Sequence, residues 1–245
     1  MVQTFLSEAL GFLRRLIHWR RRNARHIILM GGPGAGKGTL ASSLAPALGV
    51  PHLSMGSMFR AEIAAGTELG KRIEPFVKAG KLVPDADTES VYERELTHEG
   101  CVPGAVHDGF PRKFKQATFL DGLLAQWGLT VERVILIEVP KADLLERLTH
   151  RRTCTNKDCG RTYHLLRQPP REPGKCDACG HALYQRADDV PSAIEERISV
   201  FEAESKALRD YYQRRGLLVR VESTNAKGPD AVFAEVLQAV KANRS

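Results

Sequence analysis

The sequence predicts a parallel, doubly wound α/β fold, and three observations support this prediction. Short apolar runs that are typical of buried parallel strands occur at residues 26–30, 105–108, 131–139 and 217–221. Helical patterns lie between and after these runs, at residues 37–48, 114–127, 141–150 and 230–241. A glycine-rich turn joins the first strand to the first helix. Strands that alternate with helices favour a parallel sheet with helices on both faces.

The composition indicates a packed globular chain whose positive charge is unevenly distributed. Of the 245 residues, 42% are hydrophobic, which is enough for one large domain with inserts. The net charge of +7 would suit an anionic partner. Residues 1–25 contain six arginines and one glutamate, a net of +5, so the remainder carries only about +2. This near balance disfavours general nucleic-acid binding, and no apolar run approaches the roughly 18 residues that span a bilayer.

Residues 1–25 have apolar and basic residues at helical spacing and are predicted to form a basic amphipathic helix. Three interpretations remain open. The helix could lie on an anionic membrane surface, dock on the body of the protein, or serve as an organellar presequence. The presequence ranks third because such segments are rich in serine and this one is not.

Two segments interrupt the alternation of strands and helices. Residues 57–83 have the pattern of short helices without a strand, and residues 151–186 are rich in cysteine, glycine and proline. We expect both to be inserts at the carboxyl edge of the sheet, where ligands of such folds bind.

The stretch GGPGAGKGT, Gly31 to Thr39, predicts a phosphate-binding loop. Its glycines let backbone N–H groups converge on an anion at the start of a helix, and Lys37 adds a positive charge. A plain glycine turn between strand and helix would not explain the lysine. The usual pattern has Ser or Thr directly after this lysine, where its hydroxyl binds magnesium. Here Gly38 takes that position and Thr39 follows.

The stretch DGFPR, Asp108 to Arg112, directly follows a buried strand. An acid at this position in a phosphate-loop protein usually orients magnesium or its waters. If Asp108 holds magnesium through waters, a hydroxyl directly after Lys37 is dispensable. Arg112 could bind a phosphate through two hydrogen bonds. An Asp-Gly pair alone is more often a plain turn, so this motif depends on the phosphate loop for its meaning.

Four of the five cysteines form two close pairs, CTNKDC and CDAC. Each pair can place two sulfurs on one tetrahedral ion, so Cys154, Cys159, Cys176 and Cys179 predict a closed, structural zinc site. A short insert has little core of its own, and a metal can supply the missing stability. Two disulfides or four free thiols are the alternatives. Cys101 lies apart and is expected to be an ordinary, partly buried thiol.

Taken in order, these motifs resemble the adenylate kinase family in its long form with a zinc-bearing lid. They are GGPGAGKGT, MGSMFR (55–60), GKLVPD (80–85), DGFPR followed by Gln116, RRTC at Arg151, and QRADD (185–189). The resemblance covers about residues 26 to 243, and in this family a glycine after the loop lysine is normal. It implies a P-loop nucleoside monophosphate kinase domain at 26–245 with a five-stranded sheet. The monophosphate insert would be residues 54–83 and the lid residues 150–188.

The resemblance also implies roles for individual residues. ATP would be held by Gly34, Ala35, Gly36, Lys37, Gly38, Thr39, Arg147 and Arg151, with Arg147 against the base. The AMP pocket would contain Gly56, Arg60, Val83, Gly109, Arg112, Gln116, Arg186 and Arg197, with Gln116 reading adenine. Catalysis would depend on Lys37, Asp108, Arg112, Arg151, Arg186 and Arg197. No general base is needed, because the acceptor phosphate is already ionised; positioning and charge stabilisation would suffice.

Three positions depart from the family pattern. Met55 stands where the family usually has Thr, Ser57 where Asp is common, and Leu40 where Gln often occurs. These changes concern the monophosphate pocket and the phosphate-loop helix, not the class of reaction.

The expected function is therefore reversible phosphoryl transfer from Mg-ATP to AMP, giving two ADP. A GTP:AMP phosphotransferase is the alternative within the class, and a zinc-knuckle nucleic-acid-binding protein is the alternative outside it. The knuckles lie between arginines of the expected active site and have few aromatic neighbours, which disfavours nucleic acid as a partner. We expect a monomer with Mg²⁺ and structural Zn²⁺, located in the cytoplasm. An organelle, or a membrane surface bound through residues 1–25, is the alternative location.

Overall fold

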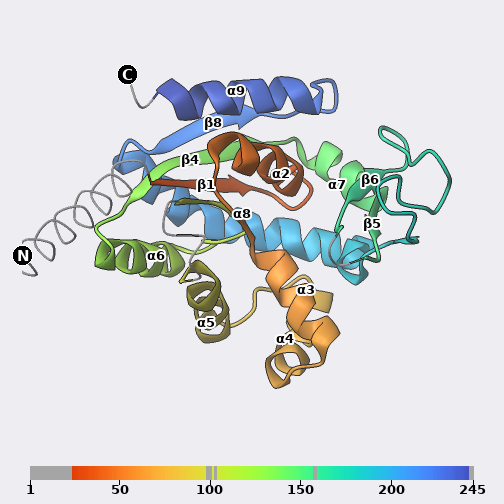
Figure 1. Cartoon of the computed structure of the whole chain (residues 1–245), viewed down its shortest axis with the longest axis horizontal. Coiled ribbons are helices and arrows are strands. Elements are labelled where there is room, and N and C mark those ends of the chain that lie inside the picture. Colours follow the sequence, from red (N-terminus) through yellow and green to blue (C-terminus); the bar gives the residue numbers. More distant parts are fainter. Residues whose placement is uncertain (1–23, 98–100, 102–103, 157–158, 243–245) are drawn as a thin grey trace, which may run out of the picture.

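The centre of the molecule is a sheet of five parallel strands in the order β2-β3-β1-β4-β8 (Figure 1). The computed structural model describes residues 24–97, 101, 104–156 and 159–242. The strands are β1 (Arg25–Gly31), β2 (His52–Ser54), β3 (Gly104–Asp108), β4 (Val131–Glu138) and β8 (Leu218–Glu222). The predicted parallel α/β fold is thereby confirmed.

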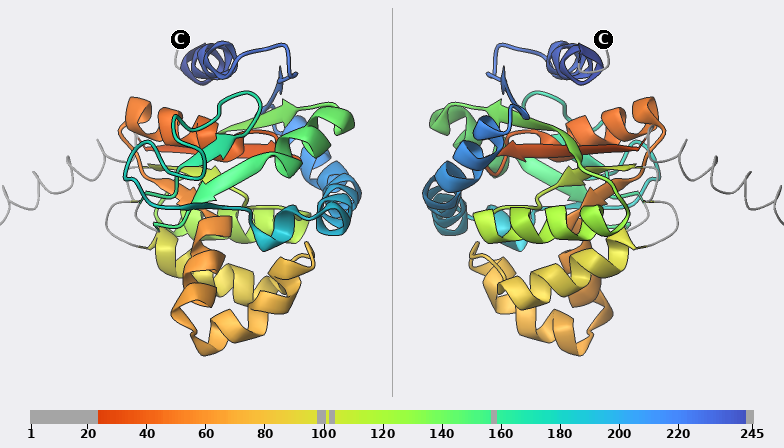
Figure 2. Two further views of the ribbon diagram at one scale, coloured as in Figure 1. Left: turned by 90° about the vertical axis from the view of Figure 1, so that its right-hand side faces the viewer. Right: turned by 90° about the vertical axis from the view of Figure 1, so that its left-hand side faces the viewer.

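Helices cover both faces of the sheet (Figure 2). One face packs against α2 (Lys37–Leu48), α7 (Lys141–Thr149) and α9 (Pro229–Lys241), and the other against α5 (Asp85–Leu96) and α6 (Phe114–Gln126). The long helix α8 (Pro191–Arg214) contributes to both cores, with its first half to the former and its second half to the latter. Side chains of β1 alternate between the two cores: Ile27 and Leu29 belong to the first, and Ile28 and Met30 to the second. Both faces of β1 are apolar because both are buried, which explains its continuous apolar run.

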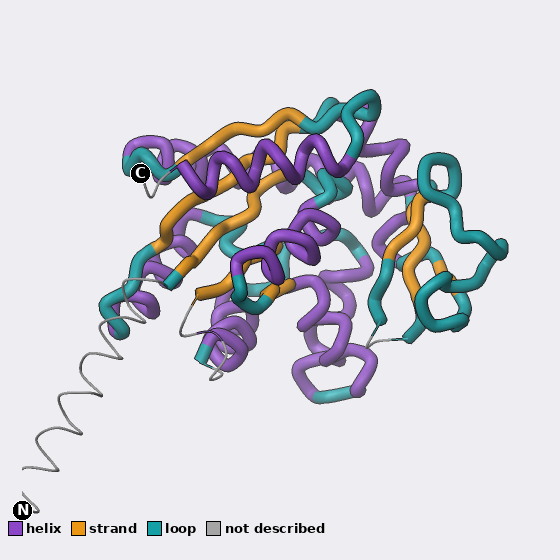
Figure 3. The backbone as a smooth tube through the Cα atoms, turned by 45° about the horizontal axis from the view of Figure 1, so that its top comes forward, coloured by secondary structure: helices purple, strands orange, loops and turns teal. Residues whose placement is uncertain are grey.

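Two inserts extend from the carboxyl edge of the sheet (Figure 3). The first contains α3 (Met55–Ala65) and α4 (Glu68–Lys78). The second is mostly loop and carries a small antiparallel sheet in the order β6-β5-β7, made of β5 (Arg151–Cys154), β6 (Thr162–His164) and β7 (Leu183–Tyr184). A short 3-10 helix, η2 (Ala187–Asp189), leads from it into α8.

The amphipathic helix expected at residues 1–25 lies outside the described residues except at its last two positions. Arg25 is the first residue of β1. Its guanidinium pairs with Glu132 on the neighbouring strand at 2.7 Å and donates to the carbonyl of Val240 at 3.0 Å. No helix in the described part of the chain has both the length and the apolar character needed to cross a membrane.

Several elements were not predicted from local patterns. Strand β2 has three residues and the lid strands have two to four, which is too short for a periodic signal. Helices α5 and α8 are largely polar, and only a narrow stripe of each is buried. Such helices are held by tertiary packing rather than by a strong local pattern.

Three buried polar side chains, from β1, β3 and α5, form a hydrogen-bonded chain between the sheet and α5. Nδ1 of His26 lies 3.0 Å from Nε2 of His107, whose Nδ1 is bonded to the hydroxyl of Tyr92. All three side chains are fully buried. Nε2 of His26 has no hydrogen-bond partner among the described residues. Burial lowers the pKa of His26 to about 4 and also lowers the pKa of His107, because it disfavours the charged imidazolium.

We expect the protein to lose stability in mild acid because of this pair. Below the ordinary histidine pKa of 6.5, the unfolded chain binds protons that folded His26 does not bind until about pH 4. The free energy of unfolding should therefore fall as the pH drops through this window, by roughly 2 kcal/mol at about pH 5 from His26 alone. Urea unfolding at several pH values measures this loss. A His26→Asn variant should show a flatter profile; an equally steep one would contradict the assignment.

Candidate active site

The loop between β1 and α2 has the backbone geometry of an anion site. Gly36 caps α2 with φ 89°, and Gly34 has φ 80°, both in the left-handed region that favours glycine. A Cβ on Gly34 would lie 2.9 Å from the side chain of Leu148, so no larger residue fits. No side chain of the described residues caps α2. The free N–H groups of its first turn therefore face the loop, where they can bind an anion.

Lys37 is folded over this loop. Its Nζ donates to the carbonyls of Gly31 and Gly32, both at 2.8 Å. Desolvation and the charges of nearby arginines together lower its pKa to about 8, against the opposing charge of Asp108. A bound phosphate would favour the charged ammonium and so counteract both the desolvation and the repulsion by the arginines.

Asp108 ends β3 beside the phosphate loop. Its Oδ2 lies 3.3 Å from both Nε2 of His52 and Oγ of Ser54, which are on the adjacent strand β2. Burial by itself raises the pKa of Asp108, but the hydrogen bond from His52 and the charge of Lys37 outweigh it, so the pKa is lowered. A Cβ on Gly38 would lie 3.5 Å from this carboxylate. The position after the lysine thus faces an ionised acid rather than providing a hydroxyl.

The first insert brings Arg60 toward the same edge of the sheet. Its Nη2 donates to Oγ of Ser57 at 3.0 Å, and a Cβ on Gly56 would lie 3.0 Å from its Nη1. Two of the three atypical positions are explained by packing. Met55 is 1% exposed and belongs to the apolar core, as does Leu40 on α2. Ser57 instead touches the arginine directly.

Arg112 and Gln116 follow β3 and are joined to each other. Nε of Arg112 donates to the carbonyl of Gly109 at 2.9 Å, and its backbone N–H donates to Oε1 of Gln116 at 2.8 Å. Gln116 is only 2% exposed, and its Nε2 donates to Oδ1 of Asp85 at 2.9 Å. Val83, just before α5, is also buried.

Asp188 and Asp189 form ion pairs that link the lid to α8. Arg151 donates to both carboxylate oxygens of Asp189, at 2.8 and 2.5 Å, and Arg197 of α8 donates to the same carboxylate at 3.2 Å. Arg197 also pairs with Asp188 at 3.0 Å. Arg186 donates to Oγ1 of Thr153 at 3.0 Å, which links the end of the lid to its beginning. Asp189 is fully buried.

The cationic cluster, defined as Lys37, Arg60, Arg112, Arg151, Arg186 and Arg197, is crowded enough for its members to perturb one another. Desolvation, together with the charges of Arg151 and Arg60, lowers the pKa of Arg186 to about 9. Desolvation, followed by the charges of Arg197 and Arg60, also lowers the pKa of Arg112. The carboxylates of Asp108, Asp188 and Asp189 cannot neutralise six cations, so the site favours a multiply charged anion.

Arg147 lies apart from this cluster, on α7. Its guanidinium is held by Oδ1 of Asn225 at 3.0 Å, Oγ of Ser223 at 3.2 Å and the carbonyl of Ser223 at 3.0 Å. These three hydrogen bonds fix the orientation of the guanidinium. A fixed guanidinium has a flat face on which an aromatic ring can stack.

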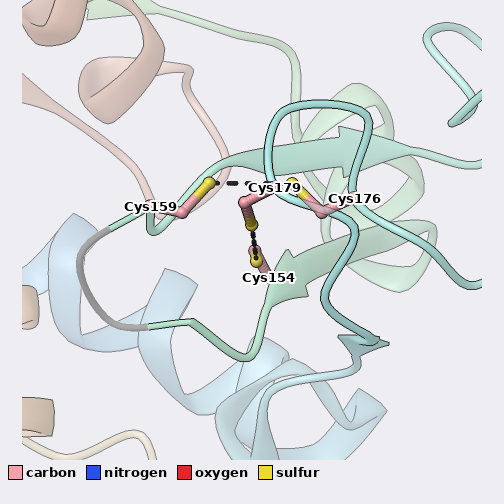
Figure 4. Close-up of side chains that lie close together, drawn as sticks. All are labelled: Cys154, Cys159, Cys176 and Cys179. Atoms are coloured by element: carbon pink, nitrogen blue, oxygen red, sulfur yellow. Dashed lines mark hydrogen bonds between the residues drawn. The ribbon is translucent and has the colours of Figure 1, made fainter.

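The four lid cysteines converge on one point (Figure 4). Their sulfurs lie within 4.8 Å of one another, with 3.4 Å from Cys154 to Cys179 and 3.6 Å from Cys159 to Cys176. Tetrahedral zinc with bonds of about 2.3 Å would separate its sulfurs by about 3.8 Å, so the arrangement fits such an ion. All five cysteines are free thiols in this structure, including the buried Cys101, so it gives no support to the disulfide alternative.

Sequence reasoning missed several residues that hold the site together. Asp188 and Asp189 occur in the quoted QRADD stretch, where their acidity next to Arg186 was a usable signal. His52 and Asn225 gave no such signal, because their partners lie 56 and 78 residues away.

Comparison with known proteins agrees with this geometry. The family model described as adenylate kinase matches residues 29–217. An adenylate kinase of Carboxydothermus hydrogenoformans is 43% identical over 215 residues, which cover 88% of this chain and 99% of that protein. One of Symbiobacterium thermophilum is 45% identical over 219 residues, covering 89% and 100%. One of Archaeoglobus fulgidus is 40% identical over 211 residues, covering 86% and 95%.

We expect Asp189→Asn to be strongly destabilising. The substitution keeps the shape but leaves Arg151 without its buried counter-charge and Arg197 with Asp188 alone, which should reduce the free energy of unfolding by about 3 kcal/mol. Urea unfolding measures the difference. Asp210→Asn is the matched control, because Asp210 pairs with Lys206 on the surface of α8 and its loss should hardly change the free energy of unfolding. Equal losses in the two variants would contradict the role given to Asp189.

Proposed function

The chain belongs to the adenylate kinase family, and we propose that its cationic cluster is the site of phosphoryl transfer from Mg-ATP to AMP. The activity is that of the family: an ATP:AMP phosphotransferase that forms two molecules of ADP and runs in both directions. The observation that carries the assignment of the site is the convergence of six cations on the loop after β1. Only a substrate with several phosphate charges matches so much positive charge.

We propose that the donor phosphates bind the loop at residues 34–39 and that the AMP phosphate binds Arg60 and Arg112. The free N–H groups of α2 and the ammonium of Lys37 support the first assignment. Desolvation lowers the pKa of both arginines, and the charge of Arg60 also lowers the pKa of Arg112, which supports the second assignment. Arg151, Arg186 and Arg197 would then surround the transferred group and stabilise the charge that spreads over its oxygens.

The acceptor phosphate is already ionised, so the residues of the site need not remove a proton. Their contribution is to align the two phosphates and to exclude water. We propose that the monophosphate insert (54–83) and the lid (150–188) close over the substrates for this purpose. A magnesium ion bound with ATP would neutralise part of the phosphate charge, and Asp108 is the residue that would orient its water ligands. Its lowered pKa and its position opposite Gly38 support this role.

We propose that the base of the donor stacks on Arg147, whose guanidinium is fixed by Ser223 and Asn225. Stacking by itself does not distinguish adenine from guanine, so ATP and GTP are both candidate donors in this pocket. The family assignment favours ATP. We also propose that the enzyme is a cytoplasmic monomer, as the default for this class of soluble kinase.

We propose that the four lid cysteines hold a structural zinc ion. The buried side chains of the lid's apolar cluster are Cys154, Tyr163 and Cys176, with Cys159, Cys179 and Leu183 packed against them. Because most of this cluster is cysteine, the lid has almost no apolar core that could stabilise it without a metal. A hydrogen bond from Tyr163 lowers the pKa of Cys176 to about 6, which favours its thiolate, whereas desolvation raises the pKa of Cys154 to about 12, so the ion would have to displace that proton.

The assay for the function is ADP formation from AMP with ATP or GTP as donor. We expect turnover with ATP, weaker turnover with GTP, and a loss of at least about 100-fold in kcat for Lys37→Met, because the ammonium stabilises charge in the transition state. Lys206→Met is the matched control and should have normal activity, since Lys206 is an exposed residue of α8. A preference for GTP would overturn the donor assignment. No transfer from either donor would overturn the function.

The zinc proposal predicts about one zinc ion per chain by native mass spectrometry. Cys176→Ser should lose the ion and melt at a lower temperature, because the lid would lose its main stabilising contact. Cys101→Ser is the matched control: its thiol is buried in the main core and should leave the zinc content unchanged. A chain with no zinc, or a Cys176→Ser variant that keeps it, would contradict the proposal.

A further inference from the structure

We propose that Asp85 is a specificity-determining positioning residue that fixes the side-chain amide of Gln116 in the orientation that matches adenine. The inference rests on the proposed role of Gln116 in reading the base of the acceptor and goes beyond it. It explains how a side chain that could be turned either way is restricted to one pattern of hydrogen bonds.

The amide of Gln116 is held at both of its polar atoms. Oε1 accepts from the backbone N–H of Arg112 at 2.8 Å, and Nε2 donates to Oδ1 of Asp85 at 2.9 Å. A backbone N–H can only donate, and a carboxylate can only accept. The two neighbours therefore require the same orientation independently. The side chain is 2% exposed, so water cannot replace either bond.

Asp85 is itself held in place from two directions. It is the first residue of α5, where the free N–H groups and the helix dipole favour a carboxylate. Its Oδ1 also lies 3.2 Å from Nζ of Lys113, the residue that precedes α6. Gln116 is in the first turn of that helix. The carboxylate therefore joins the start of α5 to the start of α6 at the amide that it orients.

The remaining capacity of this amide matches adenine. A glutamine amide has two N–H donors and two oxygen lone pairs, and one of each is used by Asp85 and Arg112. One N–H and one lone pair are left. Adenine needs that pair, because its N1 accepts and its exocyclic amino group donates. A 6-oxopurine such as hypoxanthine has the reverse arrangement, with a donor at N1 and an acceptor at O6.

A flipped amide would suit the 6-oxopurine but is disfavoured here. Turning Gln116 over would bring Oε1 against the carboxylate of Asp85 and Nε2 against the N–H of Arg112. Both contacts are repulsive and both are buried, so neither atom could find water as a substitute. A site built in this way rejects the wrong base because its own polar groups would be left unpaired.

The test compares AMP with inosine monophosphate as acceptor, with ATP as donor. We expect wild type to prefer AMP and Asp85→Ala to reduce the ratio of the two kcat/KM values by about tenfold or more, the effect of losing a hydrogen bond to a charged group. The change should appear in KM for AMP, with KM for ATP unaltered. Asp85→Asn keeps an acceptor oxygen, so its ratio of the two kcat/KM values should lie between that of wild type and that of Asp85→Ala.

Asp87→Ala is the matched control. Asp87 is the other acid in the first turn of α5, and it pairs with Arg72 at 2.5 Å instead of with Gln116. Its removal takes one negative charge from the start of α5, as Asp85→Ala does, and should leave the ratio of kcat/KM for AMP and inosine monophosphate unchanged. An unaltered ratio in Asp85→Ala, or an equal change in Asp87→Ala, would overturn the inference.

A further variant separates the inference from its premise. If Gln116→Ala leaves the preference for AMP intact, Gln116 does not read the base, and the role of Asp85 falls with it. If Gln116→Ala abolishes the preference and Asp85→Ala does not alter it, only the inference about Asp85 is wrong. A wild-type chain that does not phosphorylate AMP would instead overturn the proposed function.

Discussion

The repulsion among six cations at one edge of a sheet is the constraint on which the rest of this structure depends. Lys37, Arg112 and Arg197 come from three separate parts of the chain, and their pKa values are lowered by desolvation and by neighbouring cations. Such a cluster persists only if the fold holds it there. The buried carboxylate of Asp189 does part of this by binding two arginines at once. The remaining excess of positive charge favours the binding of a multiply charged anion.

The same constraint accounts for the division of the molecule into a rigid sheet and two inserts. The phosphate loop and Asp108 lie on neighbouring strands, with Leu29 opposite Asp108 in the register, so their relative positions are fixed by the sheet. The arginines that complete the cluster come from α3, from the two ends of the lid and from α8. An insert can move its arginines toward the site when substrate binds and away from it afterwards, whereas a strand inside a sheet cannot move in this way.

Local sequence predicts an element well where the chemistry is local. The phosphate loop depends on glycines that adopt left-handed backbone angles, such as Gly34 and Gly36, and on a lysine that bonds carbonyls five and six residues away. The cysteine spacing likewise indicated a common point for four sulfurs, and the structure brings them within 4.8 Å of one another. Strand β2 and the polar helices α5 and α8 lacked such signals.

By itself, the sequence determined the parallel α/β class and predicted the phosphate loop and the set of arginines around it. Only the tertiary structure decided which groups hold those side chains. Asp189 binds Arg151 across 38 residues, and Asp85 binds Gln116 across 31. These pairings depend on the strand order and on how helices pack at the sheet edge. No spacing along the chain encodes them, because hydrogen-bond partners are chosen by position in space once the core has formed.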